Sequence, residues 1–252
     1  MAKRSYKHQI ILSSSYSTRT RIGLDYVDDQ DGFDGAVALI RGAYGGKPVP
    51  FSVHAMSTDS GSWESIVQKD PYFDDVKIIR TVDEFVELVS RERYLKGIDV
   101  ARYILSKKKC NHTKLEKLVY LCYADYLCET GSQLFTDRIY AFRYGPVVES
   151  VYKRYKPANQ PEYHEIEPYM DKRDRWTKAE PMAIRSRLMF SEDGIRKTYS
   201  IDRTLERYIG MTAEDLVSLT HRPHSPWTHV ERIGWYDIIP DETIRKYHHN
   251  EI

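Results

Sequence analysis

The spacing of apolar residues along the chain changes near residue 97. Before it, short apolar runs bounded by turn residues predict strands. These runs cover residues 8–13, 35–40, 49–56 and 76–80. Helical spacing is confined there to a short stretch at 62–68 and to a longer one after Thr81, which with Glu84 has the form of a capping box. Gly97 is expected to end that helix. Residues 1–97 are therefore predicted to form a small N-terminal α+β domain.

After residue 97 the apolar residues recur mostly with the 3.6 period of helices. Capping-box sequences at Thr113-x-x-Glu116 and Thr212-x-x-Asp215 each predict the start of a helix. The first of these helices is expected to bury one apolar stripe and to end at Gly131. Further helices are predicted over 98–108, 147–155, with Gly145-Pro146 as the preceding turn, and 201–209.

Some stretches of this second half are less regular. Residues 157–168 are expected to be a loop because they hold three prolines, and 185–190 is left open between strand and helix. The predicted class is α+β, with a mostly helical domain over 98–240. Residues 241–252 are expected to form a polar tail that frays.

Length and composition agree with two globular domains. The chain has 252 residues, near the size at which a single core stops growing. Lys and Arg total 38 against 37 Asp and Glu, so the net charge of +1 excludes a strongly basic nucleic-acid binder. The 20 tyrosines against 7 phenylalanines leave two interpretations open, an interface or an amphipathic boundary layer of the core.

The expected cellular compartment rests on the apolar runs and the cysteines of the sequence. Its apolar runs are too short for a signal peptide or a membrane span, and its three cysteines cannot all pair within one chain. We therefore expect a cytoplasmic protein with no membrane contact. No histidine or cysteine spacing matches a metal site, so neither a metal nor another cofactor is expected.

No local motif supports catalysis. The glycines at 42–46 precede a lysine, but Arg41 and Pro48 stand where a phosphate-binding loop needs a glycine and a hydroxyl residue. The aspartates around Gly32 lack the spacing of a calcium loop and are interpreted as a solvated loop. No nucleophile elbow or metalloprotease motif is present. The protein is therefore expected not to be an enzyme.

Three strings in the second half carry a family resemblance. They are KLVYLCY at 117–123, LFTDRIYAFRYGPVV at 134–148 followed by VYKRYK, and LVSLTHRPHSPW at 216–227. Together, in this order, they resemble the Panacea domain, the family of SocA-like antitoxins and phage-associated GepA-like proteins, over about residues 98–233. The family often has an aromatic residue where this chain has Asp125.

The resemblance implies a mostly helical antitoxin that binds and neutralises a cognate protein toxin, in a bacterium, prophage or plasmid. The candidate contact residues lie in the matching strings: Tyr140, Arg143, Tyr144, Val147, Val148, Tyr152, Lys153, His221, Ser225 and Trp227. Several of these side chains could equally serve only to hold the fold together.

Three points of this interpretation stay open. One branch of the family resembles adaptors that deliver a toxin to a protease. A DNA-binding autorepressor is a further alternative, although near-neutral charge and the lack of a recognition helix disfavour nucleic acid. Self-association into a homo-oligomer is also open.

Overall fold

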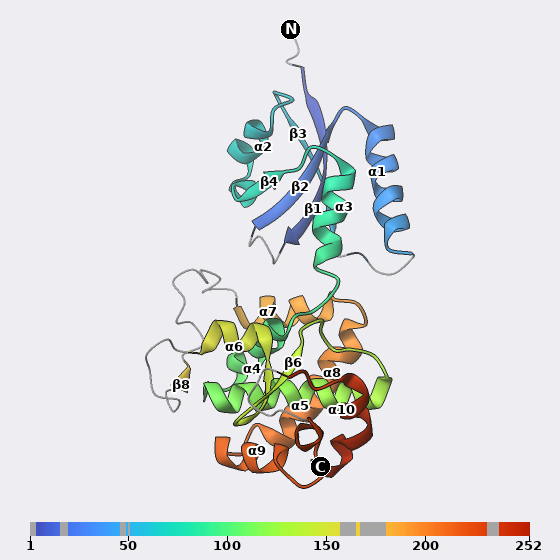
Figure 1. Ribbon diagram of the computed structural model, residues 1–252. Coiled ribbons are helices and arrows are strands. Elements are labelled where there is room, and N and C mark those ends of the chain that lie inside the picture. Colours follow the sequence, from blue (N-terminus) through green and yellow to red (C-terminus); the bar gives the residue numbers. More distant parts are fainter. Residues whose placement is uncertain are drawn as a thin grey trace. The chain divides into compact units, whose positions relative to one another are not determined.

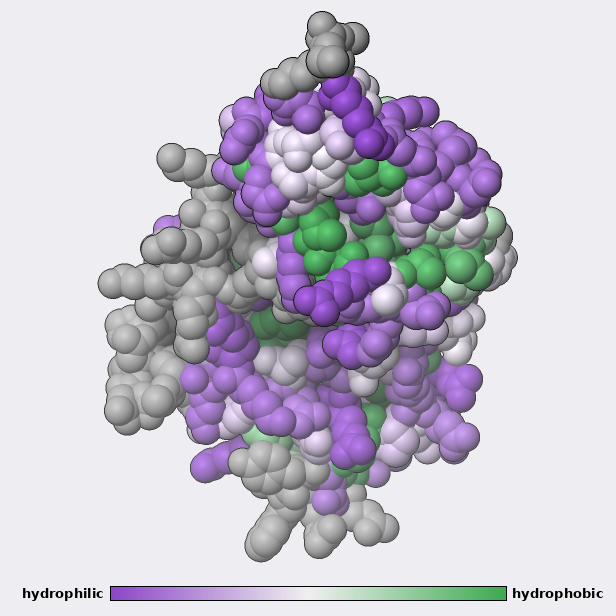
Figure 2. All heavy atoms as spheres, turned by 90° about the horizontal axis from the view of Figure 1, so that it is seen from above, coloured by the Kyte–Doolittle hydropathy of each residue, from purple (hydrophilic) through white to green (hydrophobic). Residues whose placement is uncertain are grey.

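The chain divides into two compact units, residues 1–93 and 94–252. In the computed structural model the described residues are 4–15, 20–45, 49, 51–156, 165–166, 180–230 and 237–252. The first unit is built on a β-sheet and the second is mostly helical (Figure 1). The predicted α+β class is confirmed. The surface visible in Figure 2 is largely hydrophilic, with hydrophobic side chains gathered in small areas.

The sheet of the first unit has the strand order β3-β1-β2-β4. Its strands are β1 (Tyr6–Ser15), β2 (Thr20–Val27), β3 (Ser52–Thr58) and β4 (Val76–Ile78). The central strand β1 is antiparallel to both neighbours, and β4 is parallel to β2. Both strands of the central pair carry several buried residues, which fits a sheet covered on both faces.

Helices on the two faces of this sheet bury separate apolar clusters. Ile11 of β1 packs with α1 (Gln30–Ala43) and α3 (Val82–Arg91). Its neighbour Ile10 packs with α2 (Trp63–Lys69) and the 3₁₀ turn Pro71–Phe73. Because successive side chains of a strand point to opposite faces, two adjacent isoleucines serve two cores.

The strand predicted at 35–40 is wrong, because this run lies inside helix α1. Asp29 is the N-cap residue of this helix, and its Oδ1 accepts a hydrogen bond of 2.9 Å from the backbone N–H of Gly32. Phe33, Ala36 and Ile40 are buried at helical spacing. The solvated loop expected around Gly32 is therefore wrong as well. A short apolar run does not by itself distinguish a strand from a buried helix face.

A buried histidine ties this sheet to α2. His8 is fully buried, with its Nδ1 2.8 Å from Asp25 Oδ2 and its Nε2 3.0 Å from Thr58 Oγ1. Ser65 of α2 donates a hydrogen bond of 2.9 Å to the same Thr58 hydroxyl. Burial raises the pKa of Asp25, although the contact with His8 opposes that shift. The network therefore joins three strands and one helix through side chains.

Helix α5 (His112–Thr130) is the centre of the second unit. It contacts α4 (Gly97–Lys107), α6 (Glu149–Tyr155), α8 (Gly194–Tyr208), α9 (Ala213–Thr220) and α10 (Asp241–Tyr247), and it lies among them in Figure 1. Helix α7 (Glu180–Met189) packs on α4 and α8. All side chains of α5 from Lys114 to Leu127 are buried. The single apolar stripe predicted for this helix is therefore wrong, since its polar residues are buried too.

The ends of the helices test the predicted caps. Thr212 and Asp215 form the predicted capping box of α9, and Gly131 ends α5 at a φ of 71°. At α5, however, Asn111 caps the helix by accepting from the backbone N–H of Lys114 at 2.8 Å. The capping box predicted there for Thr113 and Glu116 is wrong.

Gly97 starts a helix where the sequence predicted an end. It is the first residue of α4, whereas α3 ends at Arg91. A Cβ added at Gly97 would lie 2.5 Å from Cγ1 of Val148. Glycine is therefore required here by close packing, since its φ does not fall in the left-handed region.

Residues 139–148 form a β-hairpin in place of the predicted turn and helix start. Strand β6 (Ile139–Phe142) pairs antiparallel with β7 (Gly145–Val148), and α6 begins only at Glu149. The backbone of residues 237–239 lies along β6, with Ile239 donating to the carbonyl of Ile139 at 2.8 Å. Proline is tolerated in β7 because it is an edge strand of this hairpin.

The structure describes parts of two irregular stretches of the second unit, residues 185–190 and 157–168. Residues 185–189 lie in helix α7, so of the two structures left open for this stretch the helix is the one observed. The loop predicted at 157–168 lies outside the described residues except for the two-residue strand β8 (Glu165–Ile166), which pairs with β5 (Cys110–Asn111).

The polar tail predicted from Asp241 onward does not fray. Residues 241–247 form α10, and a 3₁₀ turn follows over His248–Asn250. Ile244, His248 and Glu251 are each 0–1% exposed. The fraying prediction rests on polarity alone, whereas His248 and Glu251 contact Asp125 and Tyr120 of α5, more than 100 residues away in sequence.

Candidate partner-binding surface

The hairpin β6–β7 ends in a tip that faces solvent. Arg143 and Tyr144 are exposed, and the Tyr144 side chain keeps 50% of its surface. The Arg143 guanidinium lies 5.7 Å from the centre of the Tyr144 ring, a cation–π arrangement. Gly145 follows with a φ of 99°, which favours glycine. The tip thus offers a positive charge and an aromatic ring on a tight turn.

Helix α5 holds the hairpin from beneath through two buried charged side chains. Glu116 Oε2 accepts from the backbone N–H of Val148 at 2.8 Å, and Lys117 Nζ donates to the carbonyl of Pro146 at 2.7 Å. Both side chains are 1% exposed. Burial raises the pKa of Glu116 and lowers the pKa of Lys117 to about 8. Hydrogen bonds to such groups are stronger than those between neutral partners, so they anchor strand β7.

The loop after α9 holds the other strand. Trp227 Nε1 donates to the carbonyl of Phe142 at 2.8 Å, and its ring centre lies 3.8 Å from that of His221. His221 Nε2 is 3.4 Å from the carbonyl oxygen of Arg143. Ser225 is buried and donates to the carbonyl of Thr220 at 2.8 Å, which closes the loop on itself. The hairpin tip is therefore held from two sides by segments far apart in sequence.

Aromatic rings continue from the hairpin onto α6. Phe142 meets Tyr152 edge to face, with ring centres 4.8 Å apart, and Tyr140 lies 6.4 Å from Phe142. Lys156 Nζ is 4.8 Å from the Tyr152 ring. Lys153, the residue after Tyr152, is exposed and forms an ion pair with Glu149, one helical turn earlier. This side of the hairpin is therefore aromatic with basic residues around it.

The structure separates the ten candidate contact residues by exposure. Arg143, Tyr144 and Lys153 are exposed, and Tyr140, Tyr152, His221 and Trp227 are partly exposed. Val147, Val148 and Ser225 are 5%, 0% and 0% exposed, so they position the surface and do not reach solvent. The strings that carry the family resemblance thus meet at one place. We name the seven residues that reach solvent the hairpin surface.

Sequence reasoning missed the residues that support the hairpin surface. The sequence places Glu116 in a predicted capping box, and neither Lys117 nor Phe142 is among the candidate contact residues. A lysine within the apolar string KLVYLCY is the one sequence signal that could have revealed the buried contact to Pro146.

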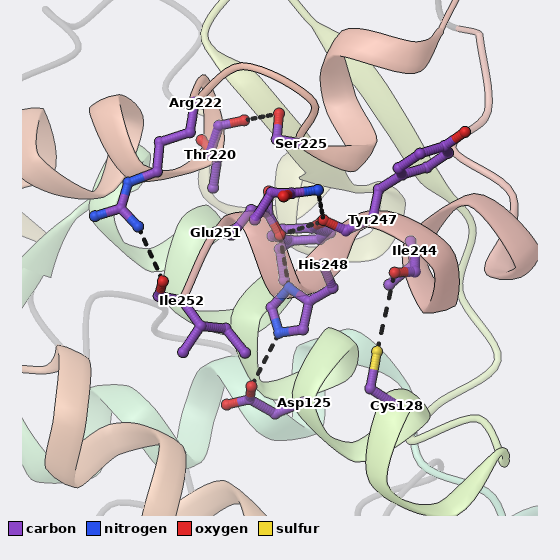
Figure 3. A network of polar contacts seen from close by, with 12 residues as sticks. Asp125, Cys128, Thr220, Arg222, Ser225, Ile244, Tyr247, His248, Glu251 and Ile252 are labelled. Carbon is purple, nitrogen blue, oxygen red and sulfur yellow. Dashed lines mark hydrogen bonds and ion pairs between the residues drawn. The ribbon is translucent and has the colours of Figure 1, made fainter.

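A second polar network lies further along α5, at its contacts with the C-terminal segment (Figure 3). The imidazole of His248 stands between two carboxylates, with Nε2 2.9 Å from Asp125 Oδ1 and Nδ1 2.6 Å from Glu251 Oε2. Tyr120 donates to the same Glu251 oxygen at 2.9 Å. Asp125 Oδ2 also accepts from Thr204 and Arg207 at 2.6 Å each. Asp125, where the family often has an aromatic residue, is thus the junction of three segments.

These contacts determine the charge of His248. Burial alone lowers its pKa, but the hydrogen bonds to Asp125 and Glu251 raise the pKa of His248 to about 9. The same imidazole helps to lower the pKa of Asp125 against the effect of burial. Burial raises the pKa of Glu251. His248 is therefore an imidazolium at neutral pH, and the two carboxylates on either side orient its ring.

The stability of this unit is expected to fall as the pH rises from about 6.5 to about 8. The folded protein holds a proton on His248 that the unfolded chain releases above 6.5, so stability that is complete below that pH is lost toward pH 9. The slope from one such group approaches about 1.4 kcal/mol per pH unit. Above pH 8, Lys117 works in the opposite direction, because its pKa is lowered.

Urea unfolding at a series of pH values, followed by circular dichroism, measures this slope. A His248→Gln variant should flatten it between pH 6.5 and 8. An unchanged slope in that variant would contradict the assignment.

Within the described residues, no cluster of three or more histidine, cysteine, aspartate or glutamate side chains is arranged to hold a metal ion. The described helices also include none that combines the length and apolar character needed to cross a membrane.

The second unit is thus a mostly helical domain with an exposed hairpin tip that is held by α5 and by the loop after α9. Residues 115–228 match the family model described as antitoxin SocA-like, Panacea domain. This match confirms the resemblance that the sequence strings predicted, and it supports an antitoxin-like role in general terms. No curated protein and no solved structure matches the chain.

Proposed function

We propose that this protein is a non-enzymatic antitoxin that binds a cognate protein toxin directly and covers its active site. The contact would be made by the hairpin surface. One observation carries this proposal: the strings that resemble the family fold around the hairpin tip, through Lys117, Pro146 and Trp227. The family match over residues 115–228 supports the same role.

The chemistry of the hairpin surface suits a protein partner. Tyrosine, tryptophan and arginine are the side chains that contribute most to protein interfaces, and all three occur here. The hairpin is fixed by α5 and by the Trp227 loop before any partner binds, which lowers the entropy cost of association. Arg143, Lys153 and Lys156 favour an acidic surface on the toxin.

Charge reversal tests this surface with little effect on the fold. Arg143→Glu and Lys153→Glu change exposed side chains, so thermal unfolding should stay near that of the wild type. Together they are expected to raise the dissociation constant for the toxin by about tenfold or more. Tyr152→Ala should weaken binding too, with some loss of packing against Phe142. Arg91→Glu, an exposed change in the first unit, is the matched control.

The probe for this test is the product of the open reading frame next to the gene. It should stop growth when expressed alone and be harmless when co-expressed with this protein. The variants are compared by growth rescue and by calorimetry with the purified product. If neutralisation survives all three substitutions, the hairpin surface is not the contact.

The same strains separate covering a toxin from delivering it to a protease. Covering predicts an unchanged half-life of the toxin after synthesis is stopped, whereas an adaptor predicts a shorter half-life when its protease is present. A shift of promoter DNA by the purified protein at physiological salt would add the autorepressor role.

A further inference from the structure

Strand β3 forms one edge of the sheet in the first unit, and no side chain of the strand protects this edge. It pairs with β1 on one side only, and its residues, Ser52–Thr58, include no proline and no charged side chain. The opposite edge strand, β4, has three residues and carries Lys77. Native sheets usually protect an edge by a short strand, a lysine or a proline, because open edges pair with other strands. Strand β3 therefore has the character of an edge that accepts a partner strand.

The backbone groups on the free side of β3 belong to Val53, Ala55 and Ser57. Lys7 of β1 is the partner of Ser57 in the register, and its carbonyl accepts from the N–H of Asp28 on the β2 side at 2.8 Å. Because hydrogen bonding alternates along an antiparallel pair, Ser57, Ala55 and Val53 direct their backbone groups away from β1. Among the described residues, those of Val53 and Ala55 have no hydrogen-bond partner, and both residues are exposed. Their N–H and C=O groups can therefore pair with an added strand.

An open hollow of about 450 Å³ lies at the end of this free edge, between β3 and α2, which are neighbours in Figure 1. Lys69 of α2 donates from Nζ to the carbonyl of Ser57 at 2.5 Å, so its ammonium stands on the free side of the strand. Thr58 and Ser65 line the hollow with buried hydroxyl groups that are 2.9 Å apart. His8 Nε2, 3.0 Å from Thr58 Oγ1, fixes the Thr58 hydroxyl from within the sheet.

The charged side chains of the hollow favour an acidic ligand. Arg4 and Lys69 line it, against a single lining carboxylate from Asp59. The Lys69 ammonium has three N–H donors, and Ser57 occupies one of them. The Arg4 guanidinium is exposed and presents a planar fork of donors that matches a carboxylate. A carboxylate in the hollow would therefore meet two cations and the neighbouring hydroxyl groups.

We propose that β3 and this hollow bind an extended segment of a partner protein, antiparallel to β3, with an acidic side chain opposite Thr58. The backbone of the segment would pair with Val53 and Ala55. Residues opposite each other in a sheet share a face, and Thr58 lies on the face that carries the hollow, so the acidic side chain enters the hollow. The proposal concerns the first unit and does not rest on the proposed function of the hairpin surface.

Charge complementarity favours such a segment over a second copy of β3. In an antiparallel pair of β3 strands that uses the free groups, a residue between 48 and 54 of the second copy would stand opposite Thr58. These seven residues include no aspartate and no glutamate. A second copy would therefore leave Arg4 and Lys69 without an acidic partner.

A synthetic peptide tests the site on the full chain. In acetyl-Glu-Thr-Val-Thr-Val-Thr-amide, antiparallel pairing puts the glutamate opposite Thr58 and the two valines on the same face, opposite Met56 and His54. Isothermal titration calorimetry is expected to give a dissociation constant below about 1 mM. The peptide with glutamine in place of glutamate should bind about fivefold more weakly. The peptide of reversed sequence should also bind more weakly, because its glutamate does not reach the hollow.

Ala55→Pro tests the strand pairing. The N–H of Ala55 points away from β1, so proline removes no hydrogen bond of the sheet and is tolerated on an edge strand. It removes a donor that the peptide needs, so binding should be lost, whereas Ala55→Thr keeps the donor and should bind like the wild type. Thermal unfolding checks that both variants are folded. In the wild type, the peptide should slow amide hydrogen exchange at Val53 and Ala55.

Lys69→Glu tests the hollow. This variant should lose the preference for the glutamate peptide over the glutamine peptide, because it replaces one of the two cations by a carboxylate. Lys77→Glu is the matched control, since it makes the same change at an exposed position of the opposite edge strand and should keep the preference.

Four results would overturn the proposal. The first is no binding of the glutamate peptide up to about 1 mM. The second is wild-type binding by folded Ala55→Pro, and the third is equal affinity for the glutamate and glutamine peptides. The fourth is a wild type that ignores the peptide but forms a dimer that Ala55→Pro abolishes, which would assign the edge to a second copy. The hairpin variants show separately whether the proposed function holds.

Discussion

Replacing Asp125 by alanine is expected to lower the free energy of unfolding of the helical unit by about 3–5 kcal/mol. The change removes the carboxylate that lies 2.9 Å from Nε2 of a buried imidazolium. It also leaves the Thr204 hydroxyl without its 2.6 Å acceptor. A buried charge that loses its partner keeps its full desolvation cost, which is why the expected loss exceeds that of an ordinary hydrogen bond.

Urea unfolding followed by circular dichroism at neutral pH measures this loss. The double variant Asp125→Ala with His248→Ala should lose less than the sum of the two single variants, because it removes the imidazolium as well. Glu214→Ala changes an exposed carboxylate of α9 and should stay within about 0.5 kcal/mol of the wild type. A loss below about 1 kcal/mol in Asp125→Ala would show that the network does not hold the unit together.

The network around Asp125 also shows which parts of this fold a sequence can reveal. The cap at Thr212 and the stop at Gly131 depend on residues within one helical turn, and both predictions are confirmed. Asp125 and His248 are 123 positions apart, and no local pattern connects them. When the contact with Asp125 is not known, a polar terminal segment with two histidines is predicted to fray.

The errors inside the elements have a similar physical origin. Helix α5 is buried all round, so its apolar and polar residues do not divide into a core face and a solvent face. The apolar run at 35–40 is too short for its period to identify α1. In both places tertiary packing decides what local periodicity leaves open.

For the hairpin surface, the family strings indicated the correct neighbourhood but not the exposure of each residue. Val147 and Val148 are adjacent on β7, and alternation along a strand predicts that one of them faces solvent. Both are buried, because α5, α6 and α9 all pack against β7. Exposure of Arg143 and Tyr144 follows from their place at the turn between the strands, which the sequence did not predict.

Gly145→Ala is expected to cost about 2–4 kcal/mol of stability and to weaken toxin binding together with it. Its φ of 99° strains any residue with a side chain. A Cβ at this position would lie 2.9 Å from both Lys117 Cε and Thr220 Oγ1. The new methyl group therefore pushes against the two segments that hold the hairpin, α5 and the end of α9.

Gly35→Ala is the matched control for this substitution. Gly35 lies exposed inside α1, and a Cβ there would meet nothing within 4 Å. Alanine should therefore stabilise the first unit by about 0.5–1 kcal/mol through its helix propensity. Thermal unfolding and calorimetric titration with the toxin measure both variants. A Gly145→Ala protein that unfolds like the wild type would contradict this prediction. It would show that the hairpin can shift away from α5 and α9 with no loss of folding free energy.

Thermal unfolding and toxin binding, measured together, distinguish a residue that positions the hairpin from one that contacts the toxin. Arg143→Glu should weaken binding with unchanged stability, because its side chain faces solvent. Gly145→Ala should change both, because it displaces the turn that carries Arg143 and Tyr144. If Gly145→Ala lowered stability yet left binding intact, the toxin would contact a surface other than the hairpin tip.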